Sequence, residues 1–248
     1  MRVVMTSILV VLLLACSGAE EKGKGVRNAE FYYGLAVNFY YDQKAQAAIR
    51  ELEQCFTLDP KHVLAHHLSG LIHMGRKEFI DSQTHFEKAL ELDPDMHMAR
   101  ANLGALFIAM QKWQQAIDTM TPLLHEAMYA TPDLAENNIG WAYYNLGSYQ
   151  QAEIHLKRAL FLNDKLCLAY NNLGVLHLSQ KRWQDARNDL EGAVTRCPNY
   201  IEAHFRLGSL LERQGVQKDA DKHFEKCRKI GGESIFGRRC KQKLQVQK

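Results

Sequence analysis

A recurring spacing of small residues constrains the fold of this chain more than any other feature. The first small residue of each repeat is alanine or glycine, and successive ones lie 34 residues apart except for one interval of 36: Ala36, Gly70, Gly104, Gly140, Gly174 and Gly208. Alanine or serine follows twelve positions later in every repeat, and proline follows 24 positions later in three repeats. Small side chains let two helix axes approach closely, and proline cannot continue a helix. The spacing therefore predicts two antiparallel helices in each repeat.

The apolar residues between these positions complete a pattern that resembles the tetratricopeptide repeat (TPR). The resemblance is clear in "NNIGWAYYNLGSYQQA" and "NNLGVLHLSQKRWQDA", which begin at Asn137 and Asn171. It covers residues 29–234 as six units starting near 29, 63, 97, 133, 167 and 201, and leaves residues 235–248 as a capping helix. One helix pair cannot bury its own apolar face, so the pairs must stack. The resemblance implies an all-α, right-handed superhelical solenoid.

The third repeat departs from the pattern. It is two residues longer than the others, and Pro122 lies inside its expected second helix. Proline removes a backbone hydrogen bond there, so we expect the helix to kink or end at this point.

The N-terminus predicts a cleaved leader. Arg2 is followed by an apolar run that is shorter than the ~20 residues of a transmembrane helix and has the layout of a secretory signal. The run closes in "LLAC", which ends at Cys16 and resembles a bacterial lipobox, where the cysteine is acylated and becomes the first mature residue. An ordinary signal peptide with a chance cysteine is the alternative.

The lipobox resemblance implies a lipid anchor. We expect a signal peptide over residues 1–15, a lipid on Cys16 and a flexible Gly-, Glu- and Lys-rich tether over residues 16–28. By the usual sorting rule of bacterial lipoproteins, Ser17 in place of aspartate directs the protein to the outer membrane, where it would face the periplasm.

Motifs for catalysis and for nucleic-acid binding are missing from the sequence. It has no G-x-S-x-G, no phosphate-binding loop, no H-E-x-x-H and no paired C-x-x-C. A net charge of +3 is too small to favour nucleic acid. Eleven histidines raise the question of a metal, but His66, His73, His177 and His204 occupy repeat positions that normally hold packing residues. We therefore expect no enzyme activity, no cofactor and no metal.

Five cysteines follow Cys16: Cys55, Cys167, Cys197, Cys227 and Cys240. Export makes disulfides feasible, and the odd number leaves at least one thiol unpaired. Cys55 and Cys227 occupy positions where alanine is usual, so each can simply be a small packing residue. A folded-back capping helix favours a Cys227–Cys240 disulfide, with Cys197 as a competing partner.

Basic residues gather near the C-terminus: Lys218, Lys222, Lys226, Arg228, Lys229, Arg238, Arg239, Lys241 and Lys243. A solvated polar end is the simplest interpretation of this cluster. A contact with an acidic protein surface or with lipid head groups is the alternative.

In a TPR array the first helices line a concave groove. Residues three before, one after and four after each first small residue then form a candidate partner-binding groove: Tyr33, Val37, Tyr40, His67, Leu71, Met74, Ile108, Asn137, Trp141, Tyr144 and Asn171. Exposed apolar and aromatic surface usually indicates binding, although curvature of the array can bury some of these side chains. A chaperone-type carboxylate clamp is disfavoured, because Tyr33 and Val37 replace its polar residues.

The whole plan of signal, lipobox, short tether and six TPR units resembles the type IV pilus pilotins. This resemblance implies a non-catalytic assembly factor that binds subunits of an outer-membrane secretin, promotes their localisation and multimerisation, and is a monomer before it binds them. One alternative is a general envelope adaptor that recruits other proteins, such as peptidoglycan enzymes. Another is an enzyme or small-ligand carrier that uses the groove.

Overall fold

The computed structural model describes residues 28–245, so the predicted signal peptide and Cys16 lie outside the described part. Residues 28–245 form thirteen α-helices and one 3₁₀ helix, with no strand, which confirms the predicted all-α fold. Within the same residues, every helix is too short or too polar to cross a membrane. The chain divides into two compact units, Met1–Leu68 and Ser69–Lys248, each described here by itself.

The first unit contains a helical hairpin and the start of a third helix. Its elements are α1 (Ala29–Tyr41), α2 (Ala45–Leu58) and the first part of α3 (Val63–Gly75). Asn28 caps α1, because its side-chain oxygen accepts a hydrogen bond from the Phe31 amide at 2.9 Å. Ala36 on α1 and Leu52 on α2 are buried between the two helices.

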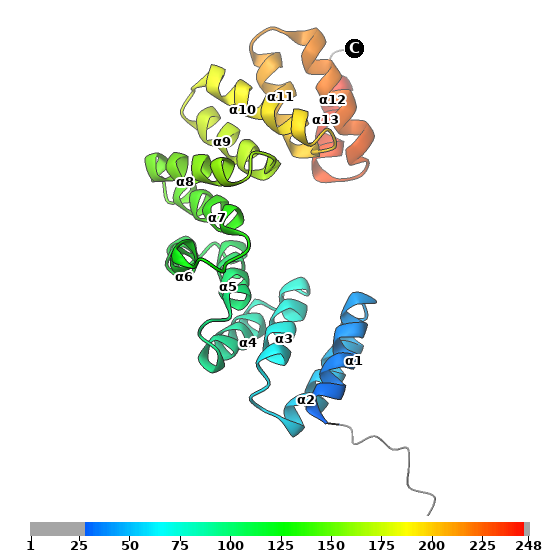
Figure 1. Ribbon diagram of the computed structural model, residues 1–248. Helices are drawn as coiled ribbons and strands as arrows, with labels where there is room; N and C mark the ends of the chain where they lie inside the picture. The colour runs from blue at the N-terminus through cyan, green and yellow to red at the C-terminus, as the bar shows by residue number, and fades with distance from the viewer. Residues whose placement is uncertain (1–27, 246–248) are drawn as a thin grey trace, which may run out of the picture. The chain divides into compact units, whose positions relative to one another are not determined.

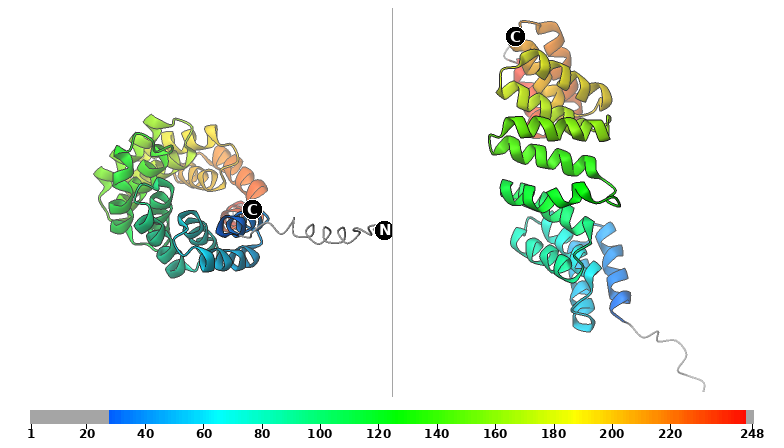
Figure 2. Two further views of the ribbon diagram at one scale, coloured as in Figure 1. Left: turned by 60° about the horizontal axis from the view of Figure 1, so that its bottom comes forward. Right: turned by 60° about the vertical axis from the view of Figure 1, so that its left-hand side comes forward.

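The second unit continues the same hairpin arrangement, and its helices pack in order of sequence (Figure 1). Figure 2 shows α7 and α8, coloured green, lying side by side. After the end of α3, its elements are α4 (Phe79–Leu92), α5 (His97–Ala109), α6 (Trp113–Met120), η1 (Thr121–His125), α7 (Pro132–Asn145), α8 (Tyr149–Leu162), α9 (Cys167–Ser179), α10 (Trp183–Arg196), α11 (Ile201–Arg213), α12 (Gln217–Gly231) and α13 (Ile235–Gln245).

The turn inside every hairpin contains a residue in the left-handed conformation. Only two of these residues are glycine, and the other four are glutamine or lysine with φ near 60°. Glycine adopts this conformation freely, whereas other residues do so at a cost. The set comprises Gln43, Lys77, Gln111, Gly147, Lys181 and Gly215.

Pro122 ends the second helix of the third hairpin. The α-helix α6 stops at Met120 after only eight residues, and Pro122 lies in the 3₁₀ helix η1 that follows. Because proline has no amide hydrogen, it cannot continue the α-helical bonding. Leu123 of η1 is nonetheless fully buried, so the chain still covers the core at this point.

In the second unit, each glycine that opens the small-residue pattern of a repeat faces a large side chain sixteen residues later. A Cβ added to Gly174 would lie 2.7 Å from the side chain of Leu190, and one added to Gly208 would lie 2.8 Å from the Phe224 ring. Such distances are far below ordinary van der Waals contact. The glycines therefore let a buried side chain of the second helix rest directly on the backbone of the first.

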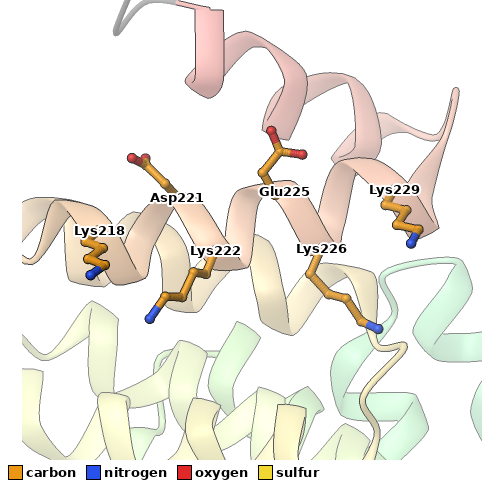
Figure 3. Close-up of a pocket in the computed structure, with 6 residues that line it drawn as sticks. All are labelled: Lys218, Asp221, Lys222, Glu225, Lys226 and Lys229. Atoms are coloured by element: carbon orange, nitrogen blue, oxygen red, sulfur yellow. The ribbon is translucent and has the colours of Figure 1, made fainter.

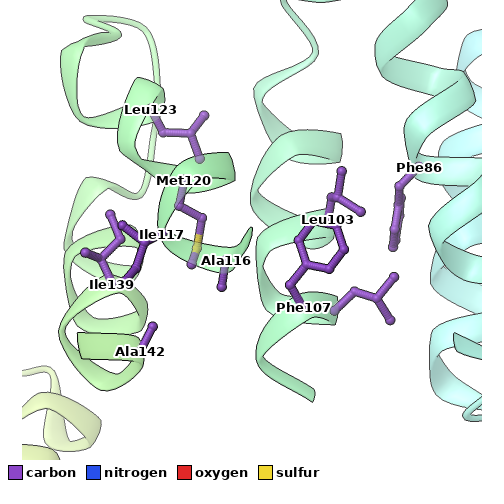
Figure 4. Packing of buried hydrophobic residues seen from close by; sticks show 10 residues of the cluster. Phe86, Leu103, Phe107, Ala116, Ile117, Met120, Leu123, Ile139 and Ala142 are labelled. Carbon is purple, nitrogen blue, oxygen red and sulfur yellow. The ribbon is translucent and has the colours of Figure 1, made fainter. Parts of the chain in front are cut away.

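The core runs between these helix pairs as a series of connected apolar contacts. Figure 4 shows one section, in which side chains from α4, α5, α6 and α7 face one another. Phe86, Leu106 and Met120 are almost completely buried there. Burial of such side chains contributes ~1.5–3 kcal/mol each, which explains how short helices are held in a fixed stack.

Disulfides tie two places in the second unit. Cys227 of α12 and Cys240 of α13 are bonded, with Cα atoms 6.1 Å apart, and this bond holds the last helix against its neighbour. A second disulfide joins Cys167 to Cys197, a pairing that sequence reasoning did not consider. Cys55 is a free, fully buried thiol whose pKa burial raises to about 11, so it stays protonated and packs as a small apolar residue.

A histidine pair lies between α11 and α12. Nε2 of His204 donates to the carbonyl of Pro198 at 3.0 Å, which leaves its Nδ1 to accept from Nδ1 of His223 at 2.9 Å. Burial lowers the pKa of both imidazoles, and their mutual repulsion when charged lowers that of His223 further. The pair is therefore stable when both rings are neutral.

Adding a methyl group at a first-helix glycine should be costly only where a partner side chain lies against it. Gly208→Ala should lower the free energy of unfolding by ~1–3 kcal/mol, because the new Cβ displaces the Phe224 ring. Gly34→Ala is the matched control, since nothing lies within 4 Å of its Cβ position, and it should stabilise by up to ~1 kcal/mol through helix propensity. Chemical denaturation measures both changes, and equal effects would contradict this description of the helix contact.

The histidine pair should make stability depend on pH. Both folded-state pKa values lie below the ordinary 6.5, so the unfolded chain binds more protons as pH falls. The contribution of the two neutral histidines to the free energy of unfolding is complete above pH 6.5 and is lost progressively below it. The free energy of unfolding, measured in urea, should therefore decline between about pH 7 and pH 5. This decline should be smaller in His223→Gln, whereas His125→Gln, at an exposed histidine, should show the same decline as the wild type. An unchanged slope in His223→Gln contradicts the assignment.

Candidate protein-binding surface

Aromatic side chains form a stack on α7 and α8. The rings of Trp141 and Tyr144 lie 5.1 Å apart at an interplanar angle of 22°, and the ring of Tyr149 lies 5.8 Å from that of Tyr144. The first two are partly exposed, and Tyr149 is 39% exposed. Tyr144 also packs against the buried cluster that includes Leu173 and Leu176, which fixes the position of the stack. We call these three residues the aromatic surface.

The aromatic surface includes one residue that sequence reasoning missed. Tyr149 begins α8, a second helix, whereas the candidate groove was built only from first-helix positions. The ring of Tyr149 comes close to that of Tyr144 because the turn between α7 and α8 is short. Gly147 adopts the left-handed conformation in this turn. A stacked aromatic group that is fixed and half exposed is a typical anchor for a protein partner.

The two asparagines predicted for the groove are buried. Asn137 and Asn171 are only 1% and 2% exposed. The Asn137 side-chain oxygen accepts a hydrogen bond from Asn172 Nδ2 at 2.9 Å, so it links α7 to α9. Because that oxygen is already bonded within the structure, Asn137 serves the contact between successive repeats.

Asn171 lacks the equivalent bond. Its side-chain oxygen is buried and finds no hydrogen-bond partner among residues 28–245. The position that matches Asn172 in the next repeat is Arg206, which instead binds Glu202 on its own helix. A buried acceptor without a partner costs ~1–3 kcal/mol, so this oxygen lowers the stability of the contact between repeats.

The remaining residues predicted for the groove fall into two sets. In the first unit, three predicted residues are partly buried: Tyr33, Val37 and His67. The ring of Tyr33 lies 4.9 Å from that of His62. Tyr40 is 36% exposed. In the second unit, three of the predicted groove residues pack against the core section of Figure 4: Leu71, Met74 and Ile108. Of the predicted groove residues, Trp141 and Tyr144 are a partly exposed pair whose rings stack on each other.

Ion pairs around Glu78 include the geometry of a candidate metal cluster. Ligand atoms of His73, Glu78 and Asp81 lie within 4.8 Å of one another. Arg76 also binds Glu78 at 2.7 Å, and His73 Nδ1 lies 2.7 Å from the same carboxylate. A guanidinium already neutralises Glu78, so these groups are better described as an ion-pair network.

A second network joins successive repeats at α8, α9 and α10. Arg182 and Lys157 both lie 2.7 Å from Glu153, and the buried His177 lies 2.6 Å from Asp189. Burial opposes ionisation of Glu153, but the hydrogen bonds from Arg182 and Lys157 outweigh it and lower its pKa to about 2. The carboxylates of Glu153 and Asp189 are therefore both paired within this network, whereas Nε2 of the buried His177 has no hydrogen-bond partner among the described residues.

Comparison with known proteins places the fold. Residues 137–201 and 171–222 match the sequence profile of a tetratricopeptide repeat family. Curated relatives include anaphase-promoting complex subunit 3 of Schizosaccharomyces pombe, 26% identical over 77% of this chain, and the BBSome complex member BBS4 of Bos taurus, 22% identical over 79%. The chain spans only 28% and 44% of the lengths of those two proteins.

Two solved structures match over nearly their whole length. PilW, described as a widely conserved type IV pilus biogenesis factor, superimposes with a TM-score of 0.75 at 20% identity and covers 84% of this chain and 96% of PilW. PilF of Pseudomonas aeruginosa gives a TM-score of 0.72 at 15% identity, covering 89% of this chain and 97% of PilF. The fold is a TPR solenoid, a scaffold that typically binds other proteins without catalysing a reaction.

The two buried asparagines should respond in opposite ways to substitution by leucine. Asn171→Leu removes an unpaired acceptor and should raise the free energy of unfolding by ~1 kcal/mol. Asn137→Leu leaves the side-chain amide of Asn172 without its acceptor and should lower the free energy of unfolding by ~1–3 kcal/mol. Denaturation in urea measures both, and equal destabilisation would mean that the Asn171 oxygen has a partner in the folded chain.

Proposed function

We propose that this chain is a non-catalytic assembly factor of type IV pilus biogenesis that binds secretin subunits and promotes their multimerisation at the outer membrane. The observation that carries the proposal is mutual coverage with PilW and PilF, each of which is matched over at least 96% of its length. The longer eukaryotic relatives share only a segment. A TPR solenoid offers the surface of its stacked repeats to a partner.

The aromatic surface supports a role in binding a protein segment. Tyr144 packs against neighbouring core residues and Trp141 stacks on Tyr144, so little conformational entropy is lost when a partner covers the two rings. The two rings suit an extended or helical segment of the partner with apolar side chains.

Attachment to the outer membrane is the second part of the proposal. It rests on the lipobox-like "LLAC" that ends at Cys16, and on Ser17 after it. Several acyl chains on one cysteine give a firm anchor without a membrane-spanning helix. The anchor would keep the solenoid at the membrane where secretin subunits meet.

Removing the aromatic surface should weaken secretin binding without unfolding the protein. Trp141→Ala with Tyr144→Ala should reduce capture of the secretin by ~10-fold or more, because central aromatic anchors dominate such interfaces. In cells we expect fewer secretin multimers and a loss of pili. Affinity capture from membranes measures the first effect, and heat-resistant multimers on gels measure the second.

A matched control removes two exposed aromatic side chains elsewhere. Tyr41 and Phe161 are 78% and 89% exposed, and Tyr41→Ala with Phe161→Ala should leave secretin capture and outer-membrane fractionation unchanged. Normal secretin assembly in the folded Trp141/Tyr144 variant contradicts the assigned surface. Capture of peptidoglycan enzymes in place of secretin by the wild type would favour a general envelope adaptor.

A further inference from the structure

Positive charge is concentrated in the last two helices. Residues 217–245 contain nine lysines and arginines against four acidic residues, whereas the rest of the chain contains 22 against 24. The whole excess of positive charge therefore lies on α12 and α13. The disulfide between Cys227 and Cys240 holds these helices together, so the charges form part of one rigid end.

Four lysines form a stripe along α12, which we call the lysine face: Lys218, Lys222, Lys226 and Lys229. Their spacing places them within roughly 80° of arc on an α-helix. The opposite side of α12 is buried through Ala220, Phe224 and Cys227. Figure 3 shows the lysine side chains extending to one side of the helix and the carboxylates of Asp221 and Glu225 extending to the other.

Counter-ions inside the protein neutralise only part of this charge. Lys222 pairs with Asp219 at 2.8 Å, and Arg228 pairs with Glu225 at 2.7 Å. The Asp221 carboxylate accepts from Gln217 at 2.8 Å. Among residues 28–245, no hydrogen-bond or ion-pair partner lies within reach of the ammonium groups of three lysines: Lys218, Lys226 and Lys229.

Two arginines of α13 have partners within the protein, unlike the three unpaired lysines of α12. The guanidinium of Arg239 lies over the rings of Phe205 and Phe236, at 5.9 and 5.7 Å, and Arg238 binds the carbonyl of Glu233. The cations that remain free on the lysine face are therefore ammonium groups on flexible stems. Such groups bind as point charges and do not need the fixed, planar geometry that an arginine requires.

The shape of the site argues for a broad anionic surface. A depression of about 620 Å³ is lined by the four lysines together with Asp221 and Glu225, and all of these residues come from α12. A single helix cannot enclose a small ligand, and none of the residues that line the depression is aromatic. Mobile head groups of a bilayer suit flexible lysines along an open helix face.

We propose that the lysine face of α12 binds the anionic phospholipid head groups of a membrane surface. The proposal does not depend on the secretin-binding role or on the lipid at Cys16. It gives the C-terminal end of the chain an electrostatic contact with a bilayer. Each lysine near an anionic bilayer contributes roughly fivefold to partitioning at physiological salt, so three free lysines contribute about 100-fold.

The test compares two triple variants of the full chain. The face variant carries Lys218→Gln, Lys226→Gln and Lys229→Gln. The matched control carries Lys77→Gln, Lys165→Gln and Lys181→Gln, at exposed lysines away from α12. Both lose the same charge, and residues 1–27 are identical in all the proteins compared. Circular dichroism and thermal unfolding check that both variants keep their fold.

Partitioning is measured on vesicles of phosphatidylcholine alone and of phosphatidylcholine with ~30 mol % phosphatidylglycerol at ~0.1 M salt. The wild type should prefer the anionic vesicles, the face variant should lose about 100-fold of that preference, and the control should keep it within about threefold. Raising the salt to ~0.5 M should abolish the preference, since the Debye length shortens.

Three results overturn the proposal. The wild type could fail to distinguish the two vesicle types. The control variant could lose as much binding as the face variant, which would reduce the effect to net charge. Soluble polyglutamate could bind the lysine face while anionic vesicles do not, which would assign the face to an acidic protein partner.

Discussion

The contact between a first-helix glycine and a large side chain sixteen residues later is the interaction on which the second unit depends. It recurs as Gly70 with Phe86, Gly104 with Met120, Gly140 with Leu156, Gly174 with Leu190 and Gly208 with Phe224. Because the first helix offers no Cβ there, the side chain of the second helix rests on its backbone and is almost completely buried. This close approach fixes each hairpin and, through it, the surface that the hairpin presents to its neighbours.

With the hairpins held by these apolar contacts, the polar groups between them vary from repeat to repeat. Asn137 and Asn172 bond between α7 and α9, His204 and His223 bond between α11 and α12, and Glu153 binds Arg182 of the next repeat. A buried polar group is tolerated only when it is paired, so each seam needs its own set of partners. Two buried atoms are exceptions among the described residues: Nε2 of His177 and the side-chain oxygen of Asn171. Arg206, at the position that matches Asn172, binds Glu202 instead of Asn171.

The same arrangement leaves two faces free to differ in chemistry. The aromatic surface on α7 and α8 is apolar and fixed, whereas the lysine face of α12 is charged and flexible. An aromatic surface gains affinity from burial and shape, while a row of lysines gains it from long-range attraction that salt weakens. The two faces therefore suit a protein segment and a membrane surface, respectively.

The sequence by itself determined the helix pairs and the break at Pro122, because residue spacing and proline act through local backbone geometry. It also indicated Trp141 and Tyr144, because their positions in the repeat lie on the first helix. Tertiary structure alone decided which side chains are exposed. Asn137 and Asn171 share the register of the predicted groove but are buried, since neighbouring repeats close over them. The sequence also left Cys197 as a rival partner for Cys227, whereas the structure joins it to Cys167. Such pairings depend on distances between repeats, which no local pattern of residues encodes.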